Sequence, residues 1–269
     1  MRTVVCGSFD PVSKSEVTSV KEIRRKYHCR EIYVFPEEKG ILSRELRRKL
    51  LETAFSAYRH IHVTETLHED DMTVQLAGPD EEKIRHGEYR LAAWGLPYIL
   101  FSEGYYLEET LDHMCKPGRK IHSYGVAETA CMLARCHGLE QQEARIASFL
   151  HDITKKWTPE EGEKLLSVWN PAALNLNPNV WHSYTAPVWI RQNMGIYNKR
   201  ILKAIEHHTL GDGKSSLDRI LYIADKIEPN RKYNTEKETA LAVKDLKKGA
   251  ELVLEEAKAY ILEKEGIHV

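Results

Sequence analysis

The length, composition and charge of the chain exclude several classes of protein. Of its 269 residues, 42% are hydrophobic and 29% are charged, which is a globular rather than a disordered composition. This length suits one large domain or two ordinary ones. The formal net charge is −1, and no window approaches about 18 consecutive apolar residues. We therefore expect neither nucleic acid nor a membrane as a partner.

The cysteines and the N-terminus indicate a cytoplasmic protein. The five cysteines are scattered, odd in number and without a Cys-x-x-Cys pair, which favours reduced thiols. The apolar segment at the N-terminus is too short for the core of a secretory signal and is predicted to be a first strand.

A small α/β module is predicted at the N-terminus. Apolar runs over 2–7 and 31–35 predict two strands, and the spacing of Val17, Val20 and Ile23 predicts a helix between them. A strand, helix and strand within about thirty-five residues form a βαβ unit, which implies a parallel sheet.

The rest of this module has a weaker pattern. An amphipathic helix is predicted over 43–58 and a third strand over 60–63. Residues 64–80 are rich in acids and are predicted to be loop, and residues 81–103 have helical stretches with breaks. We place the end of the module at residue 106.

Residues 107–269 are predicted to form an all-α bundle. Helices are expected over 107–114, 121–136, 140–152, 181–194, 200–208, 216–227 and 236–264, and one more begins after an N-cap at Thr158. The predicted fold class is therefore two-domain, with a small, truncated Rossmann-like α/β module followed by an all-α bundle.

Histidines and aspartates recur on faces of these helices that are otherwise apolar. The pair His151–Asp152 ends an apolar run, and Lys155 follows one helical turn later. The other candidates are His122, His182, His207, His208 and Asp225. Burying so many imidazoles and carboxylates is costly unless a partner satisfies them, and divalent metal ions are the usual partner for this set. The sequence therefore predicts a metal-dependent hydrolase.

The candidates divide into two groups of ligands. His122, His151, Asp152 and Asp225 suit one mixed nitrogen and oxygen site, and His182 and His208 with a bridging Asp152 suit a second. Each residue also has a plain structural interpretation. His122 would be an ordinary core histidine, His182 would lie in a surface turn, and the His151–Asp152 pair would be a simple hydrogen bond at a helix end.

The motifs around these residues resemble the HD-domain superfamily, and in particular its YqeK family of symmetrical diadenosine tetraphosphatases. The matching segments are Arg119–Val126, Phe149–Lys155, Trp181–His182, His208–Gly211 and Leu221–Arg231. The resemblance implies a di-iron centre, although the ligand types also suit manganese, cobalt, nickel or zinc. Two such metals hold a bridging hydroxide that attacks phosphorus. The implied reaction cleaves diadenosine tetraphosphate into two ADP, with Asp152 and Lys155 as catalytic residues.

The same segments suggest residues around the ligands. Arg119, Lys155 and Arg231 are expected to bind substrate phosphates by their charge, together with Thr209 from the matching segment. Glu228 is expected to orient Arg231 or a ligand histidine.

Of the neighbouring histidines His207 and His208, only one is expected to be a ligand. Adjacent residues point about 100° apart on a helix, so only one of them faces the metals. We choose His208 because it matches the family segment, and we expect His207 to lie behind the ligands or to be exposed.

The N-terminal module resembles the nucleotidyltransferase superfamily that includes nicotinate-mononucleotide adenylyltransferases. The resemblance rests on Gly7–Pro11, which reads Gly-Ser-Phe-Asp-Pro. Where that family has His-x-Gly-His, this chain has Ser13-Lys14-Ser15-Glu16, and Glu81–Arg85 only faintly matches a later motif. A glutamate repels the phosphate that the histidines would stabilise. We therefore expect a degenerate module that packs, assembles or binds a nucleotide as a regulatory unit.

Two further points stay open at the level of sequence. Another nucleotide, such as a nucleoside monophosphate, a cyclic nucleotide or guanosine tetraphosphate, is an alternative substrate. Besides the small-molecule substrate, a second copy of the chain in a homodimer is the candidate partner.

Overall fold

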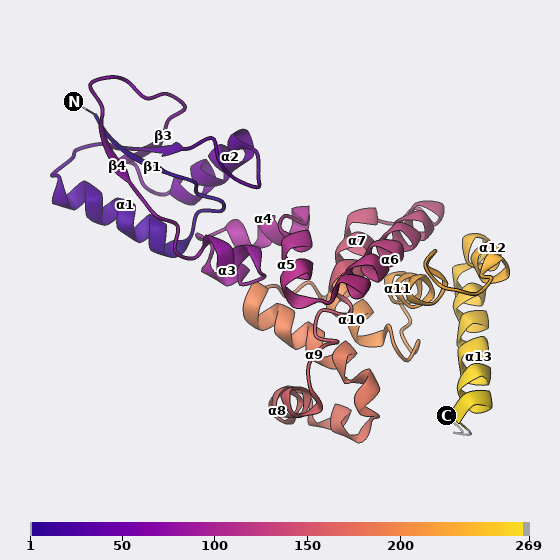
Figure 1. The fold of residues 1–269 in the computed structure, drawn as a ribbon. Coiled ribbons are helices and arrows are strands. Elements are labelled where there is room, and N and C mark those ends of the chain that lie inside the picture. Colours follow the sequence, from indigo (N-terminus) through magenta and orange to yellow (C-terminus); the bar gives the residue numbers. More distant parts are fainter. Residues whose placement is uncertain (1, 266–269) are drawn as a thin grey trace. The chain divides into compact units, whose positions relative to one another are not determined.

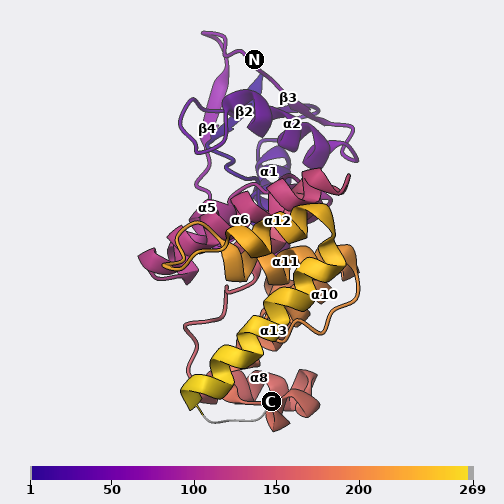
Figure 2. The same cartoon turned by 90° about the vertical axis from the view of Figure 1, so that its right-hand side faces the viewer.

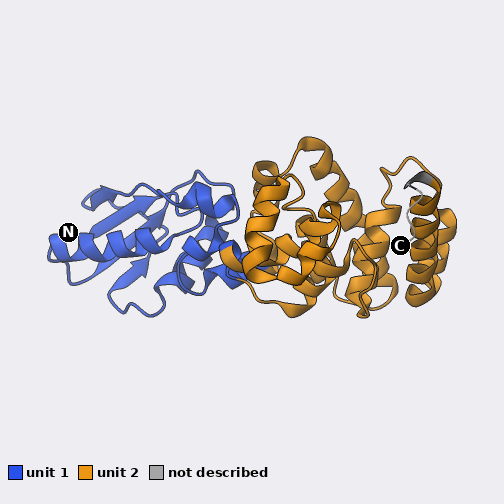
Figure 3. Ribbon diagram, turned by 90° about the horizontal axis from the view of Figure 1, so that it is seen from below, with its two compact units in different colours: residues 1–101, 193–195 blue, residues 102–192, 196–269 orange. Residues whose placement is uncertain are grey.

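The computed structural model describes residues 2–265, and the chain forms two compact units. Unit 1 comprises Met1–Phe101 and Asn193–Gly195, and unit 2 comprises Ser102–Gln192 and Ile196–Val269 (Figure 3). The predicted two-domain fold class, with a small α/β part and an all-α part, is confirmed. The domain boundary proposed after residue 106 falls within unit 2, immediately before its helix α5.

Unit 1 contains a parallel four-stranded sheet with the order β3-β2-β1-β4 (Figure 1). The strands are β1 (Thr3–Gly7), β2 (Ile32–Pro36), β3 (Ile61–Val63) and β4 (Met72–Gln75). All five residues of β1 are buried, as expected for a central parallel strand that is covered on both faces. Val5 pairs with Val34 on one side and with Val74 on the other.

The strand β4 lies in a segment that the sequence predicted to be loop, and that prediction was wrong. Its residues alternate between intermediate and exposed, so it lacks the apolar run that marks β1. Pairing with β1 defines this edge strand instead. Arg2 also holds the segment, because its guanidinium donates to both carboxylate oxygens of Asp71, at 3.0 and 2.7 Å.

The helices of unit 1 are α1 (Lys14–Lys26), α2 (Arg44–Phe55), α3 (Glu81–Arg85) and α4 (Leu96–Glu103), with a 3-10 turn at Tyr89–Leu91. The helix α1 begins with a capping box, in which Ser13 and Glu16 satisfy each other's backbone N–H groups. The helix α2 begins at Ser43, whose hydroxyl accepts from Leu46 N, as predicted.

The loop after β1 is occupied by a carboxylate of the same chain. Oε1 of Glu81 accepts hydrogen bonds from Ser8 Oγ at 2.6 Å and from Asp10 N at 3.0 Å. Glu16 is buried close by, where its Oε2 accepts from Ser13 N at 2.8 Å. Two buried acidic side chains of the chain itself, Glu81 and Glu16, therefore lie at this loop or close beside it.

Unit 2 consists of helices alone among its described residues. They are α5 (Leu107–Met114), α6 (Pro117–Cys136), α7 (Gln141–Leu150), α8 (Pro159–Trp169), α9 (Trp181–Trp189), α10 (Lys199–His207), α11 (Ser216–Ile227), α12 (Glu236–Lys244) and α13 (Leu246–Glu265), with short turns at Pro171–Asn175, Pro178–Val180 and Ile190–Met194. The helices α6 and α7 pack together (Figure 1). The helix α11 packs against both of them and against α10, and Figure 2 shows α6, α11 and α10 side by side.

The single long helix that we predicted over 236–264 is two helices. The chain leaves helical geometry at Asp245, whose Oδ1 then accepts from the backbone N–H groups of Lys247 and Lys248 and so caps α13. The absence of a side chain at Gly249 lets α13 pack closely on α12, because a Cβ there would lie 2.6 Å from Ala242 Cα. Apolar periodicity alone does not reveal this turn.

The helices and the cysteines can be compared with the predictions that the chain lacks a membrane span and has reduced thiols. No helix within residues 2–265 is both long enough and apolar enough to cross a membrane. The five cysteines are all free.

The buried Glu16 should make the stability of the chain depend on pH. Burial raises the pKa of Glu16 from 4.5 to about 8, and its Oε1 is among the buried described atoms without a hydrogen-bond partner. Because the folded state holds this proton more tightly than the unfolded chain, the stabilisation is complete below pH 4.5 and is lost as the pH rises to about 8. Glu16→Gln should therefore raise the free energy of unfolding at pH 7 by about 2–3 kcal/mol.

Chemical denaturation of both proteins across this pH range measures the effect. The exposed Glu22→Gln on the same helix is the matched control and should keep the pH profile of the original chain. Parallel profiles for Glu16→Gln and the original chain would contradict the prediction.

Candidate metal centre

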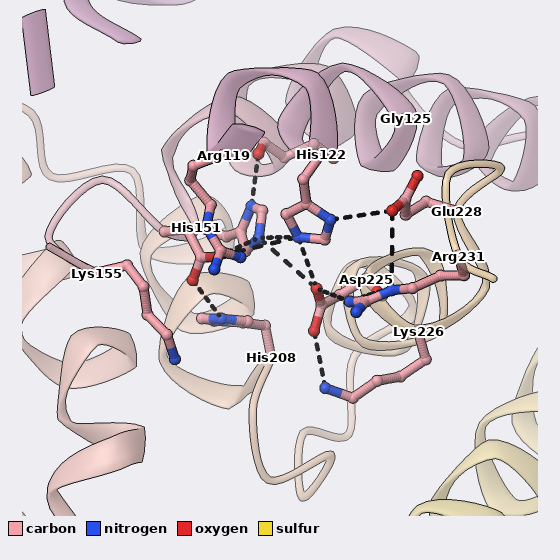
Figure 4. A network of polar contacts seen from close by, with 12 residues as sticks. Arg119, His122, Gly125, His151, Lys155, His208, Asp225, Lys226, Glu228 and Arg231 are labelled. Carbon is pink, nitrogen blue, oxygen red and sulfur yellow. Dashed lines mark hydrogen bonds and ion pairs between the residues drawn. The ribbon is translucent and has the colours of Figure 1, made fainter. Parts of the chain in front are cut away.

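Five helices of unit 2 bring the six predicted ligands to one place, and Figure 4 labels four of them, His122, His151, His208 and Asp225. His122 lies in α6, His151 and Asp152 follow the end of α7, His182 lies in α9, His208 follows α10, and Asp225 lies in the last turn of α11. All six side chains are buried, with at most 8% exposure. Residues that are as many as 103 positions apart, from 122 to 225, thus share one buried cluster.

The ligand atoms form two groups that share Asp152. The atoms of His122, His151 and Asp152 all lie within 4.8 Å of one another, and so do those of Asp152, His182 and His208. Oδ2 of Asp152 faces the first group, at 3.4 Å from His151 Nε2. Its Oδ1 faces the second group, at 3.1 Å from His182 Nε2 and 3.6 Å from His208 Nε2. Asp152 therefore has the geometry of a bridging carboxylate.

Asp225 completes the first group. Its Oδ1 lies 3.0 Å from His122 Nε2 and 3.8 Å from His151 Nε2. The first group then has two imidazoles and two carboxylates, and its role in metal binding stays a prediction.

The far side of three imidazoles is fixed by an acceptor. Nδ1 of His151 donates to Ser148 O at 2.6 Å, and Nδ1 of His208 donates to Ile205 O at 2.6 Å. These carbonyls belong to the last turns of α7 and α10, where helices leave their carbonyls without an internal partner. Nδ1 of His122 donates to Glu228 Oε1 at 3.2 Å. Each ring is thereby oriented with Nε2 toward the cluster.

This hydrogen bonding makes the cluster suitable for cations. Ser148 O and the Glu228 carboxylate can only accept, so both Nδ1 atoms carry protons and each neutral ring has a lone pair on Nε2. The Nε2 atoms of His122 and His151 are only 3.3 Å apart. Two lone pairs at this distance repel each other unless a proton or a metal ion lies near them. Mixed imidazole and carboxylate ligands suit divalent transition metals, so the residues present fit such ions.

The protonation states favour coordination by the second group. Burial lowers the pKa of His182 to about 4 and also lowers the pKa of His208, so both rings are neutral near pH 7. Burial would raise the pKa of Asp152, but the charge of His151 and hydrogen bonds from the histidines hold it well below its usual range. The pKa of His151 is raised, since Asp152 and Asp225 outweigh its burial. A bound cation would replace the proton that these carboxylates hold there.

Four cationic side chains surround the cluster. Arg119 Nη1 lies 2.6 Å from Asp152 Oδ2, Arg231 Nη2 lies 3.1 Å from Asp225 Oδ1, and Lys226 Nζ lies 2.8 Å from Asp225 Oδ2. The fourth cation, which follows α7, is Lys155, with Nζ 3.0 Å from His182 Nδ1. Sequence reasoning did not single out Lys226, although it follows Asp225 directly in the matched segment.

Two of the predicted residues make contacts away from the six ligands. His207 is partly exposed and pairs with Asp212, at 2.7 Å between Nδ1 and Oδ1. The hydroxyl of Thr209 donates to Ser183 Oγ at 3.0 Å. Glu228, by contrast, contacts His122 directly and also accepts from Asn230 N and Asn230 Nδ2, at 2.7 and 2.9 Å.

Comparison with known proteins identifies the domain that carries this cluster. The family model described as the HD domain matches residues 119–230. A symmetrical bis(5'-nucleosyl)-tetraphosphatase from Bacillus subtilis is 36% identical over 118 residues, which are 43% of this chain and 63% of that protein. A protein from Mycoplasma genitalium named "Probable nicotinate-nucleotide adenylyltransferase/Ap4A hydrolase" is 33% identical over 131 residues, which are 47% of this chain and 37% of that protein.

A solved structure has a similar fold. It comes from Clostridium acetobutylicum and is described as a predicted HD superfamily hydrolase involved in NAD metabolism. The likeness has a TM-score of 0.56 and 28% sequence identity, and it covers 60% of this chain and 88% of that chain. This chain spans less than two thirds of the length of the tetraphosphatase from B. subtilis. The segment that matches the HD-domain model, residues 119–230, includes all six clustered ligands.

Proposed function

We propose that this chain is a metal-dependent phosphohydrolase that cleaves a symmetrical dinucleoside tetraphosphate, such as diadenosine tetraphosphate, into two nucleoside diphosphates. The observation that carries the proposal is the carboxylate of Asp152, whose two oxygens face two separate groups of histidines. The names of the similar proteins from B. subtilis and M. genitalium support the choice of substrate.

A pair of divalent transition-metal ions, when bound, supplies an activated water molecule and polarises a phosphoryl oxygen. His122, His151, Asp152 and Asp225 would hold one ion, and Asp152, His182 and His208 the other. Iron is the metal that the family resemblance implies, and manganese, cobalt, nickel and zinc suit the same ligands.

The cations around the cluster bind the polyphosphate. Arg119 and Arg231 pair with Asp152 and Asp225, and their side chains are 35% and 34% exposed, so their guanidinium groups are able to turn toward a phosphate. Lys155 and Lys226 add positive charge on two further sides. These groups stabilise the negative charge that develops as a phosphorus–oxygen bond breaks.

The overall reaction consumes one water molecule. Its oxygen bonds to one of the two central phosphorus atoms while the bond from that phosphorus to the central bridging oxygen breaks. One nucleoside diphosphate carries the water oxygen and the other carries the former bridging oxygen. A panel of dinucleoside tetraphosphate, nucleoside monophosphate, cyclic nucleotide and guanosine tetraphosphate, with the products identified, tests this substrate against the alternatives.

We also propose that unit 1 packs, assembles or regulates rather than transfers a nucleotidyl group. The carboxylate of Glu81 accepts the hydrogen bonds of Ser8 and Asp10 in the loop after β1. The cytoplasmic location and the homodimer stay predictions from the sequence.

Asp152→Ala should abolish both metal retention and hydrolysis. The substitution removes the oxygens that face both groups of histidines, so we expect about two metal ions per chain to fall to nearly none and activity to fall at least about 100-fold. Elemental analysis of protein purified without chelator, together with the hydrolysis assay, measures both. Asp212→Ala is the control, because Asp212 pairs with His207 instead and is 55% exposed. Full activity of Asp152→Ala would contradict the role of Asp152 as the carboxylate shared by both metal sites.

Gly125→Ala should weaken metal binding without changing a ligand. A Cβ at Gly125 would lie 2.3 Å from Glu228 Oε2 and 2.7 Å from Asn230 Nδ2, so the carboxylate that orients His122 must move. Loss of such an orienting group typically lowers metal affinity about 10–100-fold. Competition with a chelator measures the affinity. Gly118→Ala on the same helix is the control, since nothing lies within 4 Å of its added Cβ, and equal affinities for both variants would refute the role of Glu228.

Lys155→Ala should slow hydrolysis while the metals stay bound. Lys155 contacts His182 and Asn179 O through its ammonium group but is not among the proposed ligands. Removing a cation that stabilises developing charge should lower kcat about 100-fold. Lys156→Ala is the matched control, because the neighbouring ammonium donates to His113 O instead. A Lys155→Ala protein with the original kcat would exclude the proposed role.

A further inference from the structure

A hollow of about 240 Å³ opens beside the metal centre. It lies between α8 and the segment that leads into α9, and its apolar walls include Trp157, Trp181, Pro159 and Pro178. We call it the indole hollow after its two tryptophans.

The indole hollow shares two residues with the centre. His182 and Lys155 line it, and Nε2 of the same His182 ring lies 3.1 Å from Asp152 Oδ1. One imidazole ring therefore separates the hollow from the bridging carboxylate. A nucleotide whose phosphates bind at the centre would have its nucleoside within reach of this hollow.

The walls suit a flat aromatic ligand. Trp181 is held in place, because its Nε1 donates to Leu176 O at 3.0 Å and its ring packs on α8, where a Cβ at Gly162 would lie 3.3 Å from Cε3. Trp157 lines the same hollow and is half-buried, so the protein does not enclose it completely. Indole rings bind nucleobases by stacking, and this preference tolerates different bases.

The size of the indole hollow limits what it can bind. Pockets that enclose a whole drug-sized ligand have volumes of about 300–1,000 Å³. At about 240 Å³ the hollow is too small for a dinucleotide but has room for a single base. The exposed Asn179 also lines it, and an amide side chain pairs well with the edge of adenine.

We propose that the indole hollow is a nucleobase subsite, in which one base of the substrate or product stacks on Trp157 while its phosphates bind at the metal centre. This inference rests on the proposed function for the kind of ligand that occupies the centre. In this arrangement the tryptophans bind the nucleoside, whereas the metal ligands and the cationic side chains bind the metal ions and the phosphates.

Calorimetric titration of the full chain loaded with Mn²⁺ tests the subsite with two probes, ADP and inorganic pyrophosphate. ADP contains the same diphosphate plus a nucleoside, so it should bind the original chain about 10-fold more tightly than pyrophosphate. Trp157→Ala should remove most of this preference and leave pyrophosphate binding unchanged. Trp157→Phe, which keeps an aromatic face, should restore the affinity for ADP to within about 3-fold.

Trp169→Ala is the matched control, because Trp169 ends α8, is 56% exposed and is not part of the hollow. Equal binding of ADP and pyrophosphate by the original chain would overturn the subsite. So would a Trp157→Ala protein that loses affinity for both probes in the same proportion. A chain that hydrolyses no nucleotide but keeps its preference for ADP would refute the proposed function and leave the subsite standing.

Discussion

The structure of unit 2 depends on keeping two ionised carboxylates, Asp152 and Asp225, in a buried place. An isolated buried charge costs several kcal/mol or more, so such groups persist only with close partners. Here four imidazoles and three cationic side chains lie within 4 Å of the two carboxylates. The lone pairs on the Nε2 atoms of His122 and His151 repel each other, and the negative charges of Asp152 and Asp225 attract cations. Both effects favour a cation between these side chains. Metal binding therefore satisfies an arrangement that the protein alone satisfies incompletely.

The ends of helices produce this geometry. His151 and His208 both follow the last residue of a helix. The carbonyl groups in the last turn of a helix have no backbone N–H partner within the helix, so they can accept a hydrogen bond from Nδ1. In both cases the acceptor is the carbonyl three residues earlier, in Ser148 and Ile205. A local feature of the backbone thus orients two ligands of different groups in the same way. His122 lies within a helix, so it has no such carbonyl, and the side chain of Glu228 takes that part.

Sequence reasoning found the elements with strong patterns and the residues with unusual chemistry. The apolar run of β1 and the clustered histidines stand out because burying them requires an explanation. The edge strand β4 and the turn at Asp245 were missed, because their formation depends on pairing and packing between segments. Lys226 was missed because a lysine beside an aspartate resembles any exposed pair. The indole hollow joins residues from two segments, so only the fold reveals it.

The two units place their buried acidic side chains in different surroundings. In unit 2 the carboxylates lie among cations and imidazoles, so a bound metal ion would offset their negative charge and allow a phosphate to bind nearby. In unit 1 the carboxylate of Glu81 accepts the donors of the loop after β1, and Glu16 stays protonated near neutral pH because burial raises its pKa to about 8. The hydroxyl of Ser8 and the backbone N–H of Asp10 are therefore already engaged within the chain, and a protonated Glu16 adds no positive charge beside them.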